Sequence, residues 1–164
     1  NDPSTIVHCT GIVILLGIAM GLGLMGIDVE KTNPLDPNSI LERLVGVWIA
    51  VMTTLVCWIL WSTVTYVFAS KFLGGKGKFR NTVRALGVSC GPGILMLFNN
   101  IPAFGFYAWV IGSMWVFAVS VMAVHEINDV DWLGAFLSTL VGWCLCFVFL
   151  PEVLLRPLLT QSIN

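Results

Sequence analysis

The sequence predicts an all-α integral membrane protein with five transmembrane helices. Of its 164 residues, 57% are hydrophobic and only 10% are charged, whereas a soluble domain has about 25% charged residues. Mean hydropathy is +0.92, and the charged residues are concentrated in short segments between long uncharged runs. At about 20 residues per span, the chain forms a single membrane domain and has no room for a large soluble catalytic domain.

A basic, glycine-rich segment fixes the predicted orientation. The run Lys71–Arg84 contains five of the eight basic residues, namely Lys71, Lys76, Lys78, Arg80 and Arg84. Such a loop between two apolar runs is typical of the cytoplasmic side of a membrane. We expect these side chains to set the topology. The alternative is that they also bind anionic lipid headgroups, each contributing on the order of 1 kcal/mol.

The uncharged runs define the spans and their order. The predicted spans are 6–27, 44–70, 85–98, 101–124 and 132–150, and an interfacial segment comes after them at 151–159. Alternation from the basic loop places the N-terminus in the cytoplasm and the C-terminus outside. The segment His125–Asp131 is predicted to be an acidic turn between the last two spans.

Small residues in the first span have the spacing of a helix-packing motif. Gly17 and Gly21 are four residues apart, and Ala19 and Gly23 repeat this spacing on an adjacent stripe. Small residues at such positions let a second helix approach closely. We therefore expect a packing function for them.

The third span is interrupted by Gly91, Pro92 and Gly93, a combination that breaks or kinks a helix. A break at membrane depth requires neighbouring protein or water to satisfy the backbone. The sequence favours a packed kink. The alternative is a polar cavity, and its lining would comprise Ser89, Asn99, Asn100 or Ser113.

The sequence contains few residues in patterns that are typical of catalysis or transport. No span contains Asp, Glu, Lys or Arg in its interior, which disfavours pumps and transporters of charged substrates. Common metal and serine hydrolase signatures are missing, so we expect no enzymatic activity and no catalytic residues. The five cysteines lie in apolar runs and are predicted to be buried small hydrophobes, not metal ligands or disulfides. Net charge gives no indication of a nucleic-acid partner.

Two histidines, His8 and His125, are predicted to lie near the cytoplasmic face. A neutral imidazole is a good axial ligand for haem iron or for the magnesium of chlorophyll. The favoured alternative is structural, with His8 at the interface and His125 at the C-terminal end of the fourth helix, where a cation is favourable. The sequence therefore predicts no cofactor, with haem or chlorophyll contact as the alternative.

From about Trp48 to about Leu150, the order of features resembles the Ypt/Rab-interacting protein family, or Yip domain, in its small prokaryotic form. The resemblance rests on Leu73-Gly74-Gly75-Lys76-Gly77-Lys78-Phe79-Arg80, then Val83-Arg84-Ala85-Leu86-Gly87, Gly91-Pro92, Ile101-Pro102 and Val124-His125-Glu126. The segment His125–Asp129 departs from the family's small, glycine-containing turn. The resemblance implies five spans and a cytoplasmic N-terminus. Eukaryotic relatives act in vesicle transport and bind prenylated small GTPases through a long N-terminal region that this sequence does not contain, so that activity is not transferred.

Three functions remain as hypotheses. The leading one is a non-catalytic scaffold or accessory protein that associates with other integral membrane proteins through its glycine-bearing helix faces, as a subunit of a larger complex in a bacterial inner membrane. The second is an accessory subunit of a respiratory or photosynthetic complex. The third is a small-solute channel or intramembrane enzyme. Lipids and membrane proteins are the expected partners.

Overall fold

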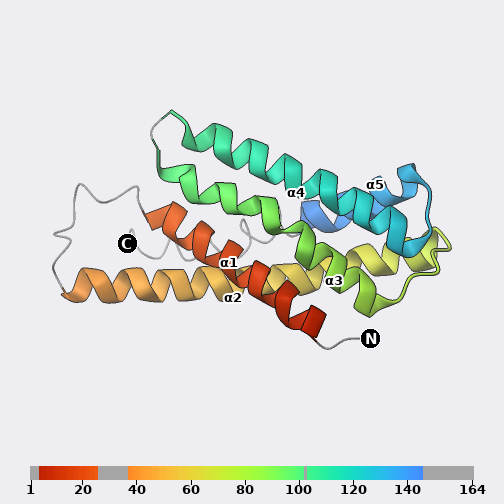
Figure 1. Cartoon of the computed structure of the whole chain (residues 1–164), viewed down its shortest axis with the longest axis horizontal. Coiled ribbons are helices and arrows are strands. Elements are labelled where there is room, and N and C mark those ends of the chain that lie inside the picture. The colour runs from red at the N-terminus through yellow and green to blue at the C-terminus, as the bar shows by residue number, and fades with distance from the viewer. Residues whose placement is uncertain (1–3, 26–36, 102, 146–164) are drawn as a thin grey trace, which may run out of the picture.

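The computed structural model describes residues 4–25, 37–101 and 103–145, and all regular structure in these residues is helical (Figure 1). The five α-helices are α1 (Ser4–Met25), α2 (Pro37–Val67), α3 (Phe79–Ser89), α4 (Gly105–Asn128) and α5 (Trp132–Cys144). Two other helical segments are η2 (Phe68–Phe72), a π-helical turn that continues α2, and η3 (Gly91–Asn100), a 3-10 helix that comes after α3. The predicted all-α fold is thus confirmed for the described residues.

Within the described residues, three helical stretches are long and apolar enough to cross a membrane: Ser4–Leu22, Leu44–Phe72 and Gly105–Asn128. They overlap the predicted spans 6–27, 44–70 and 101–124. The total number of spans and the side on which each terminus lies stay predictions.

Two helix boundaries differ from those expected. α2 begins at Pro37, before the predicted start of the second span at residue 44. Proline is well tolerated in the first helical turn, where its missing N–H is not needed. α4 continues to Asn128, so most of the predicted turn at 125–131 is helical. The chain leaves α4 only at Asp129, which has the left-handed backbone conformation with φ 54°.

The third predicted span, 85–98, consists of two different helices. α3 ends at Ser89, and η3 begins at Gly91 with Pro92 in its first turn. Proline cannot donate the α-helical hydrogen bond, which accounts for the change of helix type at this point. At about 1.5 Å per α-helical residue and about 2.0 Å per 3-10 residue, the two segments add up to about 36 Å.

The last predicted span, 132–150, is described only as far as 145. Its start agrees with the prediction, because α5 begins at Trp132 and the side chain of Asp131 accepts a hydrogen bond of 3.1 Å from the N–H of Gly134. The rest of this span, the interfacial segment 151–159 and Cys146 lie outside the described residues.

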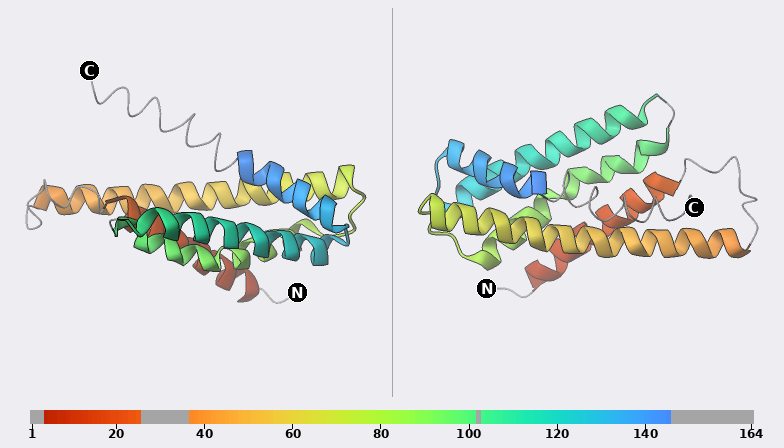
Figure 2. Two further views of the ribbon diagram at one scale, coloured as in Figure 1. Left: turned by 90° about the horizontal axis from the view of Figure 1, so that it is seen from above. Right: turned by 180° about the vertical axis from the view of Figure 1, so that it is seen from behind.

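The helices form two approximate layers (Figure 2). α2 and α5 lie in one layer, and α1, α3 with η3, and α4 lie in the other. Two tryptophans of α2 donate hydrogen bonds within the core, Trp58 to α3 in the other layer and Trp61 to α5 in the same layer. Trp58 donates from Nε1 to the carbonyl of Val83 at 3.2 Å, and Trp61 donates to the carbonyl of Thr139 at the same distance. Both rings are buried, as expected for packing residues too deep to be interfacial anchors.

Cys9 and Cys90 are buried in the core, whereas Cys57 and Cys144 are partly buried. The predicted burial of the cysteines is thus found at Cys9 and Cys90.

Candidate functional site

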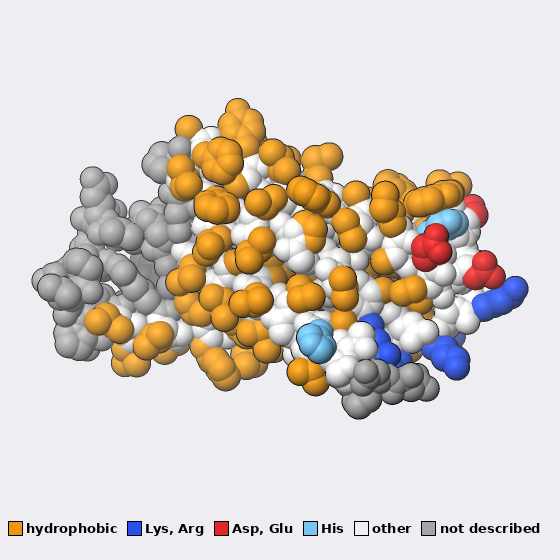
Figure 3. Space-filling view, in the orientation of Figure 1, with side chains coloured by type: hydrophobic (Ala, Val, Ile, Leu, Met, Phe, Trp, Pro, Cys, Tyr) orange, Lys and Arg blue, Asp and Glu red, His pale blue; other side chains and the backbone are white. Residues whose placement is uncertain are grey.

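Charged side chains gather at one end of the molecule (Figure 3). The loop between η2 and α3, Leu73–Lys78, meets the turn between α4 and α5, Asp129–Asp131, at this end. The backbone N–H of Lys76 donates to the carbonyl of Asn128 at 2.9 Å, and Lys76 Nζ lies 3.7 Å from a carboxylate oxygen of Asp129. The ion pair is exposed and contributes little to stability. The backbone contact therefore defines the junction of the two loops.

Asn128 is the polar centre of this junction. Its side chain is fully buried at the C-terminal end of α4. Its Nδ2 donates to the carbonyl of Val124 at 3.3 Å, and its Oδ1 accepts from the hydroxyl of Thr82 at 3.1 Å. Because a buried amide without partners is costly, the bond from Thr82 fixes α3 in one position on α4, and the backbone bond from Lys76 holds the glycine-rich loop beside it.

The glycines of the loop permit this close contact. A Cβ atom on Gly77 would overlap Oδ1 of Asn128, and one on Gly75 would lie 2.9 Å from the carbonyl oxygens of both Ala69 and Asn128. Gly74 has a positive φ of 69°, which glycine adopts without strain. The Gly-Gly-Lys-Gly run is therefore used for backbone packing.

His125 takes part in the same junction. Its Nδ1 donates to the carbonyl of Val130 at 2.5 Å, and its ring stacks on Trp132 with a centroid distance of 4.1 Å. The histidine thus holds the turn that leads into α5. No group of three or more His, Cys, Asp or Glu side chains suited to a metal ion is present in the described part of the chain.

The predicted basic loop is shorter than its sequence suggested. Lys71 belongs to η2, and Arg80 and Arg84 lie in α3, which leaves Lys76 and Lys78 in the loop itself. Lys71, Lys76, Lys78 and Arg80 are exposed, and Arg84 is partly buried. The backbone carbonyl of Arg84 accepts a bond of 3.3 Å from the thiol of Cys9 in α1. This contact places the part of α3 that carries Arg84 beside the first turns of α1.

His8 is separate from the loop junction. It is exposed in the first turns of α1, and its Nδ1 donates to the carbonyl of Ser4 at 2.6 Å. Each of the two candidate ligand histidines therefore uses one ring nitrogen for a hydrogen bond to the backbone.

Gly17 and Gly21 lie against α2 of the same chain. A Cβ on Gly17 would be 2.7 Å from Cα of Val51, and one on Gly21 would be 3.0 Å from Cα of Val47. Ala19 is buried, whereas the surroundings of Gly23 are not described. The close approach expected from the spacing is therefore made within the chain, and this face of α1 is not available to another protein.

The Gly91–Gly93 break is packed against apolar side chains. A Cβ on Gly93 would lie 2.6 Å from a methyl group of Leu16, and Gly91 faces open space. The hydroxyls proposed for a polar cavity bond within their own helices. Ser89 donates to the carbonyl of Ala85 and Ser113 donates to the carbonyl of Val110, both at 2.9 Å.

Sequence reasoning missed the junction at Asn128 and the small side chains between α2 and α5. The hydroxyls of Ser62, Thr65 and Thr139 are buried without a hydrogen-bond partner among the described residues, and Gly142 packs on Trp61 of α2. The sequence did contain a signal for this contact, because small residues are three or four positions apart in both helices. They are at positions 62 and 65 in α2 and at positions 135, 138 and 142 in α5.

The helical architecture and apolar surface define the chain as an integral membrane protein. Residues 3–154 match the model of the Yip1 domain. The chain therefore belongs to the Yip1 domain family. No curated protein and no solved structure matched the chain.

Proposed function

We propose that the protein is a non-catalytic scaffold or accessory subunit that binds other integral membrane proteins within the bilayer. The observation that carries this proposal is the outer face of α2. The apolar stretch Leu44–Phe72 has 29 residues, which corresponds to about 43 Å of helix, whereas the hydrocarbon core is about 30 Å thick. Such a helix must tilt, or its excess apolar length must be covered by another protein.

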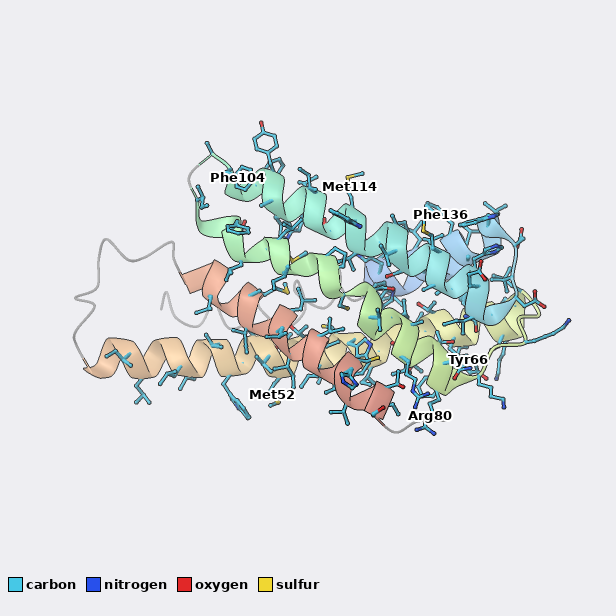
Figure 4. The ribbon with its side chains drawn as sticks, viewed as in Figure 1. Met52, Tyr66, Arg80, Phe104, Met114 and Phe136 are labelled. Carbon is cyan, nitrogen blue, oxygen red and sulfur yellow. The ribbon has the colours of Figure 1, made fainter. Side chains whose placement is uncertain are left out.

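The N-terminal part of α2 extends beyond the other described helices in every view (Figures 1 and 2). α1 crosses α2 at Val47 and Val51. Next to this crossing, exposed apolar side chains form one broad helical face, which we call the outer α2 face: Leu44, Val45, Trp48, Ile49 and Met52. Figure 4 shows Met52 at this outer edge.

A stripe with this composition suits a protein partner. Residues separated by four positions lie on one face of a helix, and tryptophan is enriched among the residues that dominate binding energy. Lipid also covers apolar side chains, but α2 has more apolar length than the hydrocarbon core can cover. A protein partner that covers the excess length gains additional free energy.

The loop junction supports a non-catalytic function. Its most distinctive residues, Gly75, Gly77 and Asn128, are used for close packing and for internal hydrogen bonds. The basic side chains around the junction are well placed for the inner leaflet, where they would fix the cytoplasmic orientation. A bacterial inner membrane remains the proposed location.

The proposal is tested by purification from the native membrane in mild detergent, followed by mass spectrometry and an absorption spectrum of the same fraction. We expect a colourless fraction with stoichiometric membrane-protein partners. A protein that is recovered alone after gentle cross-linking in the membrane would contradict the proposal. Haem or chlorophyll bands in the fraction would instead support a subunit of an energy-converting complex, and His8 and His125 would be the first residues to replace.

A further inference from the structure

An apolar groove runs between α4 and α5 on the outside of the bundle. Its volume is about 540 Å³, within the range of about 300–1,000 Å³ that is common for ligand sites. Met122 and Trp132 line the end near the loop junction, and Ser113 and Trp143 line the opposite end. Met114, Met122, Trp132 and Phe136 are exposed, so the groove is open at the side. Met114 and Phe136 are labelled in Figure 4.

The length of the groove matches one leaflet of a bilayer. Between Ser113 and Met122 the helical rise gives about 14 Å, and between Trp132 and Trp143 it gives about 16 Å. Half of the hydrocarbon thickness is about 15 Å. Because α4 and α5 are joined by a short turn and line the groove together, its long axis runs along the two helices.

The lining excludes a polar ligand. The side chains that line the groove are apolar apart from Ser113 and the indole N–H groups, and the hydroxyl of Ser113 already bonds to the carbonyl of Val110. Two methionines, Met114 and Met122, lie in the wall, and flexible thioethers adapt to irregular apolar shapes. A flexible hydrocarbon chain fits this surface.

The loop junction marks the end of the groove that faces the membrane–water interface. Trp132 stacks on His125, and the exposed Lys76–Asp129 ion pair belongs to the same end of the molecule. Charged side chains and an exposed tryptophan mark the membrane–water interface. The opposite end, at Ser113, is therefore near the middle of the bilayer.

We propose that the α4–α5 groove binds one acyl chain of a phospholipid from the leaflet on the loop side. The headgroup lies beside the 129–131 turn and the chain terminus lies near Ser113 and Trp143. This inference requires a membrane protein but does not depend on the scaffold function, which concerns the outer α2 face.

The test uses photoreactive lipids that report depth. The full-length protein is reconstituted in vesicles of phosphatidylethanolamine and phosphatidylglycerol that contain phosphatidylethanolamine with a diazirine near the carboxyl end or near the methyl end of one acyl chain. We expect cross-links from the first probe at Met122 and Trp132, and from the second at Met114 and Trp143. Equal labelling of the groove and of the outer α2 face, or the reversed order of depth, would overturn the proposal.

A variant separates the groove from the general lipid surface. Ala118→Trp fills the groove, because residue 118 lines it, and we expect its cross-linking yield in the groove to fall about tenfold. Ile111→Trp is the matched control on the exposed surface of α4, and its yield should not change. An unchanged yield in Ala118→Trp would contradict the proposal. Cross-links that form without the lipid probe and place residues 146–164 or a second copy of the chain in the groove would contradict it as well.

Discussion

Asn128 shows how one buried side chain organises the charged end of the protein. Its amide and carbonyl groups are bonded to Val124 within α4, to Thr82 in α3 and to Lys76 in the loop. A partly satisfied group at this depth would cost about 1–3 kcal/mol. The local stability of the junction should therefore depend on each bond.

Two threonine-to-valine substitutions test this dependence. Thr82→Val leaves Oδ1 of Asn128 without its donor, and we expect a loss of stability of about 1–3 kcal/mol. Thr139 is also fully buried, but its hydroxyl has no partner among the described residues, so Thr139→Val should be neutral or stabilising. Thermal unfolding of the detergent-solubilised protein measures both, and equal midpoints in the two variants would contradict the role of the Thr82 bond.

A glycine in the loop gives a second prediction at this scale. In Gly77→Ala, the new methyl group would overlap Asn128 and would also lie 2.8 Å from the carbonyl oxygen of Ile127. We expect the thermal midpoint to fall, with a cost of about 1–3 kcal/mol for overpacking. Gly91→Ala is the control, because a methyl group there meets open space. If both variants unfold at the wild-type temperature, the loop does not pack as described.

Sequence analysis identified the Gly-Gly-Lys-Gly run but assigned it to topology. The run is basic, and charge is visible in a sequence, whereas its contact with Asn128 joins residues about fifty positions apart. Nothing in the local pattern marks Asn128 as buried, since it lies between charged residues.

At the scale of elements, α1 and α2 make a close contact at the small residues that the sequence marked for helix packing, although the sequence did not identify α2 as the partner helix. Gly17 and Gly21 bring the two backbones together at Val51 and Val47. Close approach increases van der Waals contact, which is a main source of helix association in lipid.

The α1–α2 contact is tested by Gly17→Ala with Gly11→Ala as its control in the same helix. A methyl group at position 17 would be 2.7 Å from Cα of Val51, which is backbone and cannot rotate away, whereas position 11 is open. We expect Gly17→Ala to destabilise the protein by about 1–3 kcal/mol. The yield of monodisperse protein and its thermal midpoint provide the measurement. A larger effect at position 11 than at position 17 would contradict the observed packing.

The elements that sequence analysis placed well are the long uncharged ones. Length and hydropathy were sufficient for α1, for most of α2 and for α4. The end of α4 was missed because His125–Asn128 has the composition of a turn. In the structure, the buried side chain of Asn128 and the bonds of His125 and Asn128 to other segments hold this end of the helix in place. The Gly91–Pro92–Gly93 break was predicted, but its 3-10 helix was not, because proline indicates a break without specifying the conformation of the residues after it.

At the scale of the whole molecule, the basic end predicts the orientation. With Lys71, Lys76, Lys78 and Arg80 exposed at one end, the positive-inside bias places this end in the cytoplasm. We expect Lys78→Cys, in a background that lacks the native cysteines, to react with a membrane-impermeant maleimide only when the cytoplasmic face is accessible. Labelling from the outside of intact cells would reverse the proposed topology.

The class of protein and its family could be inferred from the sequence, whereas the surface that we propose for partner binding could not. Hydropathy shows that a segment contacts lipid or protein but does not distinguish the two. In the structure, Gly17 of α1 packs against α2, whereas Trp48 on the outer α2 face is exposed. This difference depends on how α1 crosses α2.

The most direct test of the scaffold function compares two tryptophans. Trp48 on the outer α2 face is 63% exposed, and Trp115 on α4 is 55% exposed. The wild-type protein and the variants Trp48→Ala and Trp115→Ala are purified from the native membrane in mild detergent, and co-purifying membrane proteins are quantified by mass spectrometry. We predict that partner yield falls about tenfold in Trp48→Ala, a change expected for a dominant interface residue, while Trp115→Ala retains its partners. Equal partner yields in all three proteins, with each variant folded and inserted, would contradict the assignment of the outer α2 face as the binding surface.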